Sequence, residues 1–225
     1  MFSLRYYPLE QTEEEVNNLY ALLSAEEKQR VSQLAFQKDR NEYIVSRGIL
    51  RRLIGEKISC APENVAFGYT ANGKPYLLNG AVHFSLSHSN KYVLYAFSFD
   101  WEIGVDLEHC NPKTDIEGLA KFSFHPEERR ILENCSSIEE KRRLFFSIWT
   151  KKEAFLKALG EGFGDISPTA INLASSPAYL PNHNRDFPYW KVISCELIDG
   201  YASAVAYPSE ALESGLNVLY SPDSE

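Results

Sequence analysis

The five residues Gly104–Glu108, which read GVDLE, constrain the fold of this chain more than any other stretch. Val105 and Leu107 alternate with Asp106 and Glu108, and this period of two predicts a β-strand with its apolar face on a core. The two carboxylates then share the opposite face, with their Cβ atoms about 7 Å apart. Carboxylates this close repel one another unless a cation lies between them or one is protonated. The strand therefore predicts half of a site for a hard divalent cation such as Mg²⁺, with a solvated strand face as the alternative.

Composition narrows the class of protein. The chain has 225 residues, of which 44% are hydrophobic and 24% charged, as in globular proteins with a sizeable core. A net charge of −8 argues against nucleic acid as the main partner. No apolar run approaches the ~20 residues that cross a bilayer, and the N-terminal residues lack a signal-peptide pattern. These features predict a soluble, cytoplasmic protein that binds neither nucleic acid nor membrane.

Positive charge is concentrated in one region of this acidic chain. Residues 28–57 carry eight basic side chains against three acidic ones. A local basic face suits a small anionic ligand or an acidic protein partner, and the alternative is a solvated helix face. The basic residues are Lys28, Arg30, Lys38, Arg40, Arg47, Arg51, Arg52 and Lys57.

The order of elements predicts an α+β fold made of two similar halves, residues 1–100 and 101–225. In each half, helical periodicity is followed by short β-rich runs separated by turn residues. The tail from Pro208 is predicted to be peripheral. Helices are predicted after the caps Thr12 and Ser24, over Asp39–Gly55, from Pro126, and over Ile138–Leu159. Strands are predicted at Val65–Tyr69, Pro75–Leu78, Val82–Leu86, Tyr92–Phe99, Ile171–Leu173, Tyr189–Ile198 and Tyr201–Tyr207.

The last predicted helix carries a second informative pattern. Trp149, Glu153 and Lys157 recur at intervals of four residues and form one stripe, roughly opposite an apolar stripe that includes Ile148 and Phe155. An exposed Glu–Lys pair would contribute only a few tenths of a kcal/mol. That reading leaves a tryptophan in solvent, which is uncommon. If another layer covers this stripe, a metal ion and a phosphate are natural partners for the two charges.

Two shorter stretches are weaker signals when taken alone. Phe84–Ser89, which reads FSLSHS, places hydroxyl groups around a histidine at the end of a strand, where they could bind phosphate. Asn72–Pro75, which reads NGKP, is a tight turn with a lysine at its tip. A structural histidine and an ordinary turn are the plain alternatives.

Together these motifs resemble the 4′-phosphopantetheinyl transferases, in particular the longer, surfactin-type branch. The motifs are GKP at Gly73–Pro75, FSxSHS at Phe84–Ser89, GVDLE at Gly104–Glu108, and WTxKEAxxKAxG at Trp149–Gly160. They occur in the family's order and approximate spacing, and span most of residues 70–160. The resemblance implies a pseudo-twofold pair of α+β halves with coenzyme A in the cleft between them.

The resemblance also implies roles for individual residues. Asp106, Glu108 and Glu153 match the family's Mg²⁺ ligands, where Mn²⁺ can substitute, and Lys157 matches the lysine on the pyrophosphate. The adenosine and 3′-phosphate end is matched by Lys74, in the motif with Pro75, and by Ser87 and His88. Arg30 and either Arg40 or Arg47 are expected at basic, phosphate-contacting positions. Glu127 corresponds to another acidic residue near the metal, although Ser123 splits a phenylalanine pair that is usual in this region.

The implied activity transfers the phosphopantetheine arm of coenzyme A to a serine of an apo acyl, polyketide or peptidyl carrier protein, releasing 3′,5′-ADP. A base must take the serine proton, and Glu153 or Glu127 is the candidate. Phe122 and Phe124, or basic residues such as Arg51 and Arg52, are expected to contact the carrier.

Two alternatives remain open on sequence. One is a coenzyme A or nucleotide-binding module without catalysis, and the other is a Mg²⁺-dependent enzyme, such as a phosphatase or nucleotidyl transferase, acting on a different phosphate ester. The short holo-acyl-carrier-protein synthase branch carries one half per chain and forms trimers. The length of this chain therefore predicts a monomer.

Overall fold

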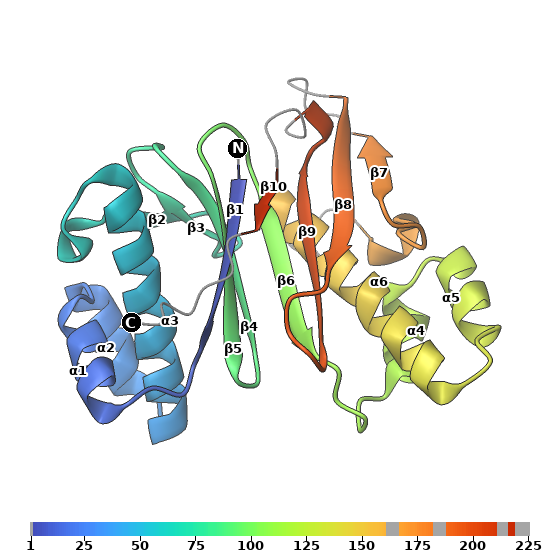
Figure 1. Ribbon diagram of the computed structural model, residues 1–225, viewed down its shortest axis with the longest axis horizontal. Helices are drawn as coiled ribbons and strands as arrows, with labels where there is room; N and C mark the ends of the chain where they lie inside the picture. The colour runs from blue at the N-terminus through green and yellow to red at the C-terminus, as the bar shows by residue number, and fades with distance from the viewer. Residues whose placement is uncertain (1, 161–166, 182–187, 211–215, 219–225) are drawn as a thin grey trace.

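The computed structural model describes residues 2–160, 167–181, 188–210 and 216–218. Figure 1 shows two halves side by side, each with a sheet and a long helix. The long helices α3 and α6 both have 22 residues, and each half is built on a four-stranded sheet, although one strand of the first sheet, β10, comes from the end of the chain. The predicted α+β fold is confirmed.

The first half contains β1 (Phe2–Pro8), α1 (Glu13–Ala21), α2 (Ala25–Gln33), α3 (Gln37–Ile58), β2 (Phe67–Tyr69), β3 (Pro75–Leu77), β4 (His83–Ser89) and β5 (Tyr92–Ser98). Beyond it lie β6 (Gly104–His109), α4 (Ile116–Ser123), α5 (Pro126–Glu133), α6 (Ile138–Leu159), β7 (Ala178–Pro181), β8 (Tyr189–Cys195), β9 (Tyr201–Pro208) and β10 (Leu216–Val218).

Helix starts in the first half follow the local sequence. The side chains of Thr12 and Ser24 accept hydrogen bonds from backbone N–H groups at the starts of α1 and α2, and Glu27 completes a capping box on α2. Helix α3 is longer than predicted and ends at Ser59, which adopts a left-handed conformation. These helices cover the outer side of the first sheet (Figure 1). None of the described helices is long and apolar enough to span a bilayer.

The strands of the first sheet are not arranged in their order along the chain. Its strand order is β10-β1-β5-β4, while β2 and β3 form a separate hairpin. Strand β1 is absent from the sequence-based prediction, although Phe2 and Leu4 alternate with polar residues and are buried. The tail was predicted to be peripheral; its residues Leu216–Val218 form an edge strand that pairs in parallel with β1.

The second sheet is antiparallel in the order β6-β9-β8-β7, with α6 packed on β6 and β9. The closest approach is at Gly104, where a Cβ atom would collide with the backbone of Ala154 and Ala158. The glycine of the GVDLE motif therefore lets α6 lie directly against β6. This contact places the charged side of α6 beside the carboxylates of the strand.

One apolar cluster joins the two sheets. It contains Phe2 from β1, Leu94 from β5, Val105 from β6 and Val205 from β9, all at most 3% exposed. Val105 thus faces a core as predicted, but the other face of β6 is covered as well. Asp106, on that other face, is only 2% exposed, so the solvated strand face is excluded.

Candidate functional site

An acidic cluster lies where β6 meets α6. Strand β6 supplies Asp106 and Glu108, and α6 supplies Glu153 and Lys157 to the same cavity of about 530 Å³. The Lys157 ammonium donates to Asp106 Oδ1 at 2.7 Å and to Ser87 Oγ at 2.9 Å. Trp149 lines this cavity too, so the stripe predicted on α6 faces one ligand-sized space rather than solvent.

Burial sets the charge properties of this cluster. It raises the pKa of Glu153 to about 7, with a further contribution from the negative charge of Asp106, while Lys157 acts in the opposite direction. Burial also raises the pKa of Glu108, and a hydrogen bond from Ser89 partly offsets it. The one positive charge of Lys157 therefore does not balance the three carboxylates of the cluster.

The donor set fits a hard divalent cation. Asp106 Oδ2 is buried, and no described residue hydrogen-bonds to it. Carboxylate oxygens are the ligands that Mg²⁺ prefers. Within the described part of the chain, however, no three His, Cys, Asp or Glu side chains already stand in ligating geometry. Asp106, Glu108 and Glu153 line one cavity, so side-chain rotation is the adjustment that binding would require.

Two further cavities extend the first into a groove. A cavity of about 240 Å³ shares Leu86, Glu153 and Lys157 with it, and is also lined by Lys74 and Pro75. On the other side, a cavity of about 760 Å³ shares Tyr43 and Arg47 with it. Several predicted coenzyme contacts lie in these cavities. The 530 Å³ cavity is lined by Arg47, Ser87, His88 and Lys157, and the 760 Å³ cavity is lined by Arg30 and Arg47.

Arg47 brings positive charge to this groove. Its guanidinium lies 5.7 Å from the ring centre of Tyr43 and 5.9 Å from that of Tyr69. One terminal nitrogen is buried, and no described residue accepts its hydrogen bond. A buried cationic donor without an acceptor favours an anionic ligand.

Lys74 is fixed at the far end of the groove. Its ammonium donates to Glu102 Oε2 at 2.8 Å and to the Ala158 carbonyl near the end of α6 at 3.2 Å. His83 contacts the other oxygen of Glu102 at 3.0 Å. Ala158 belongs to the motif on α6, whereas Glu102 lies outside the sequence motifs and is a residue that pattern reasoning missed.

Two predicted site residues lie outside these three cavities. The Arg40 guanidinium donates to the carbonyls of Leu34 and Ala35 and thereby fixes the chain before α3. Glu127 makes an exposed ion pair with Arg130 one turn along α5, at 2.6 Å. The hydrogen bonds from Arg130 hold the Glu127 pKa below its usual value. The predicted roles of Arg40 and Glu127 stay predictions.

Two residues expected at a carrier-binding surface are buried. Phe124 is fully buried and stacks on Phe145, with ring centres 5.1 Å apart. Arg51 is 2% exposed and donates to Glu27 at 2.6 Å. The prediction that Phe124 and Arg51 are exposed is therefore wrong, because each side chain packs between neighbouring elements. Phe122 is 77% exposed, as predicted.

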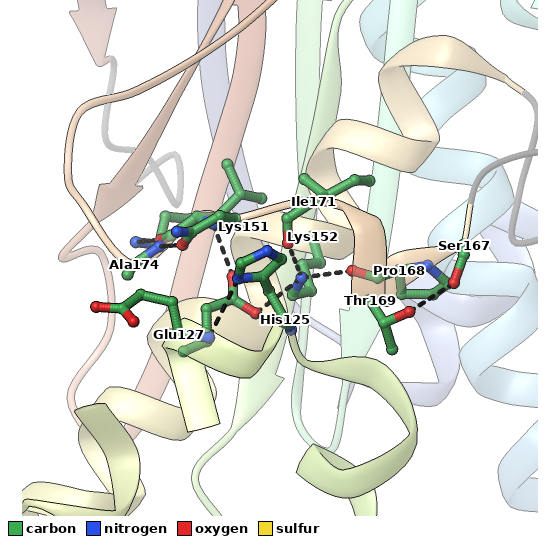
Figure 2. Close-up of polar contacts among 12 residues, drawn as sticks. His125, Glu127, Lys151, Lys152, Ser167, Pro168, Thr169, Ile171 and Ala174 are labelled. Carbon is green, nitrogen blue, oxygen red and sulfur yellow. Dashed lines mark hydrogen bonds and ion pairs between the residues drawn. The ribbon is translucent and has the colours of Figure 1, made fainter. Parts of the chain in front are cut away.

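A buried ionic network beside the cluster was also missed. Lys152 Nζ lies 2.9 Å from Glu128 and donates to the carbonyls of Pro168 and Ile171 (Figure 2). Glu128 accepts hydrogen bonds from the backbone N–H groups of Leu173 and His125, both at 2.7 Å. The strand predicted at Ile171–Leu173 does not form, because these backbone groups bond to charged side chains instead.

Lys151 makes the equivalent contacts one residue earlier. It donates to the carbonyls of Leu173 and Ser175, and burial lowers its pKa to about 8. A sequence signal for both lysines existed. They follow Ile148 by three and four residues and so fall on the apolar stripe of α6, where solvated lysines are not expected.

Comparison with known proteins identifies the family. The model of the 4′-phosphopantetheinyl transferase superfamily matches residues 102–206, and that of the 4′-phosphopantetheinyl transferase N-terminal region matches residues 9–99. The chain is 36% identical to 4′-phosphopantetheinyl transferase HetI of Nostoc sp. over 204 residues, covering 88% of this chain and 84% of that protein. It is also 36% identical to a putative 4′-phosphopantetheinyl transferase of Synechocystis sp., covering 83% and 80% of the two chains.

A solved structure gives a weaker likeness. The holo-[acyl-carrier-protein] synthase of Thermotoga maritima matches with a TM-score of 0.35 and 20% identity, covering 48% of this chain and 62% of that one. This likeness is too low to support an assignment, whereas the sequence relatives span most of the chain. On that basis, and in agreement with its four motifs, the chain belongs to the 4′-phosphopantetheinyl transferase superfamily and is an enzyme of that family.

Proposed function

We propose that this enzyme transfers the 4′-phosphopantetheine arm of coenzyme A to a serine of an apo acyl, polyketide or peptidyl carrier protein. The observation that carries the proposal is one groove with an acidic cluster and Lys157 at its centre and, beside them, a buried Arg47 nitrogen that has no acceptor among the described residues. A molecule with a pyrophosphate and a separate phosphate matches this distribution of charge. The N-terminal half supplies Arg47 and His88, and the C-terminal half supplies the carboxylates.

In the proposed reaction, the carrier serine oxygen attacks the β-phosphorus of the coenzyme. The bond from that phosphorus to the bridging oxygen breaks, and 3′,5′-ADP leaves. Mg²⁺, or Mn²⁺ in its place, held by Asp106, Glu108 and Glu153, would supply charge neutralisation on the pyrophosphate. Lys157 adds positive charge at the same place, since it already lies 2.7 Å from Asp106.

Glu153 is the better candidate for the base that accepts the serine proton. A general base works best when its pKa lies near the working pH, and in the metal-free protein burial raises the pKa of Glu153 to about 7, from which a bound cation would lower it. Glu127 is the other candidate, but its pKa is lowered by Arg130, which makes it a weaker base. The three carboxylates and the lysine together argue against a binding module without catalysis.

The first test is intact-protein mass spectrometry. A purified apo carrier protein, incubated with the enzyme, coenzyme A and Mg²⁺, should gain the mass of one phosphopantetheine arm, and EDTA should prevent the gain. Fatty-acid, polyketide and peptidyl carriers would be tested in parallel. No gain on any of them, with coenzyme A still bound, would instead support the non-catalytic alternative. Release of phosphate from other esters would support the second alternative.

Exposed aromatic surface on α4 is proposed to contact the carrier. Phe122 is 77% exposed at the end of α4 in the C-terminal half. Phe122→Ser is expected to raise KM for the carrier roughly five- to tenfold, since exposed aromatic anchors dominate many interfaces. The KM for coenzyme A should stay unchanged. Phe36→Ser is the matched control, because Phe36 is 71% exposed but precedes α3 in the other half. Equal effects of the two substitutions would contradict the assignment.

We further propose that residues 1–100 and 101–225 form one active unit and that the enzyme works as a monomer. Both halves line the groove, so a single chain supplies every residue that the reaction uses. Light scattering on the active protein would measure its mass in solution. The cytoplasmic location stays a prediction.

A further inference from the structure

Strands β4 and β6 lie side by side at the junction of the two halves but belong to different sheets. Their backbones therefore do not form a continuous ladder there. Ser85, Ser87 and Ser89 occupy alternate positions of β4 and so project from the same face. All three hydroxyl groups reach β6. We call these three residues the serine row.

Each member of the serine row makes a different contact. Ser85 Oγ accepts a hydrogen bond from the backbone N–H of Val105 at 3.1 Å. Ser87 Oγ donates to Asp106 Oδ1 at 2.8 Å and accepts from Lys157. The row thus replaces the missing backbone ladder with hydroxyl groups, two of which also touch carboxylates of the acidic cluster.

Ser89 holds β6 at two points. Its Oγ accepts from the backbone N–H of His109 at 3.0 Å and donates to Glu108 Oε2 at 2.9 Å. The first bond fixes the hydroxyl relative to the strand, and the second fixes the carboxylate relative to the hydroxyl. Glu108 is only partly buried, and Ser89 and Trp149 both hydrogen-bond to its carboxylate, so loss of the Ser89 bond leaves it held from α6 alone and free to sample more orientations.

We propose that Ser89 is a positioning residue for divalent-cation binding. Its hydroxyl fixes one oxygen of Glu108 and so keeps this carboxylate in the cavity shared with Asp106 and Glu153. The inference rests on the proposed function, in that the acidic cluster is taken to hold the cation. It goes further because it proposes that Ser89, in the first half of the chain, sets the orientation of the cation ligand Glu108 in the second half.

The expected size of the effect follows from other metal sites. Loss of a hydrogen-bonding partner of a metal ligand typically lowers metal affinity by about 10–100-fold. The Ser89 bond lies at the rim of the cavity, so Ser89→Ala is expected to weaken binding by about tenfold, at the lower end of that range. Ser89→Thr keeps the hydroxyl and should restore most of the affinity.

Ser85→Ala is the matched control. It also removes a hydroxyl of the serine row that accepts from a β6 backbone N–H, but Ser85 touches no carboxylate. The probe is Mn²⁺ alone, titrated into the full chain and followed by electron paramagnetic resonance of the free ion. Urea unfolding of each variant measures how much stability the lost hydrogen bond removes. If Ser89→Ala does not fold, Ser89→Cys serves instead, since a thiol is a weak donor of nearly the same size.

The proposal predicts weaker Mn²⁺ binding for Ser89→Ala and an unchanged dissociation constant for Ser85→Ala. It is overturned if Ser89→Ala binds Mn²⁺ like the wild type, or if both substitutions weaken binding equally. In either case the cation site itself stands, because the wild type binds. A wild-type chain that binds no Mn²⁺ would overturn both this inference and the proposed metal set. Carrier modification, measured separately by mass, would still report on the transfer reaction.

Discussion

Glu153→Gln is expected to abolish phosphopantetheine transfer while leaving the chain folded. The substitution keeps the shape of the side chain but removes the proton acceptor and one negative ligand from the acidic cluster. Loss of a general base alone typically lowers the rate by about 10²–10⁴-fold, and loss of a cation ligand adds to this. The measurement is the initial rate of carrier modification, with Glu139→Gln, an exposed position in the first turn of the same helix, as the control.

The pH dependence of stability provides an independent check on Glu153. Its pKa in the folded protein is raised from 4.5 to about 7. A raised carboxyl pKa means that the ionised form is disfavoured in the fold, so the carboxylate destabilises the metal-free protein increasingly as pH rises from about 4.5 to 7. Glu153→Gln should therefore raise the Tm of the metal-free protein at pH 8 and change it little at pH 4.

For the catalytic prediction, a folded Glu153→Gln variant that transfers phosphopantetheine at a near-normal rate would contradict the proposed role of Glu153.

Glu128→Gln is expected to destabilise the fold by about 3–5 kcal/mol, the usual cost of removing one partner from a buried ion pair. Glu128 is fully buried, lies 2.9 Å from Lys152 and accepts two backbone hydrogen bonds. Without its charge, the buried Lys151 and Lys152 would lack a counterion and would keep only neutral acceptors, namely backbone carbonyls and the new amide oxygen. Urea unfolding measures the change in free energy.

The neighbouring residue offers a control for this prediction. Glu127 precedes Glu128 but forms an exposed ion pair with Arg130, so Glu127→Gln should change stability little. The double variant Glu128→Leu with Lys152→Met should lose less stability than the two single variants together, because no charge of that pair is left alone. Near wild-type stability of Glu128→Gln would show that the network contributes little.

Local patterns account for what the sequence predicted well. The caps at Thr12 and Ser24, the period of two in Gly104–Glu108 and the stripe of Trp149, Glu153 and Lys157 all depend on residues within one or two turns of each other. Such spacings determine which face of an element a side chain occupies. Because β6 and α6 pack together, the faces that carry Glu153 and the two β6 carboxylates meet at one cavity.

What the sequence did not predict depends on contacts between distant segments. The pairing of β1 with Leu216–Val218 joins the two ends of the described chain, and no local pattern specifies it. The backbone of Ile171–Leu173 has an apolar, strand-like sequence, but lysines some twenty residues away take its carbonyls. An arginine such as Arg51 is normally found at the surface, but here it is buried because it pairs with Glu27 on another helix.

The apolar cluster between the sheets has a consequence for how the chain folds. Its members come from β1 and β5 of the first half and from β6 and β9 of the second, so the face that each sheet turns toward the other is covered only while the halves are together. Separating the halves would expose both faces to water at the same time. The two halves look like separate domains, but we expect them to unfold together in one cooperative transition.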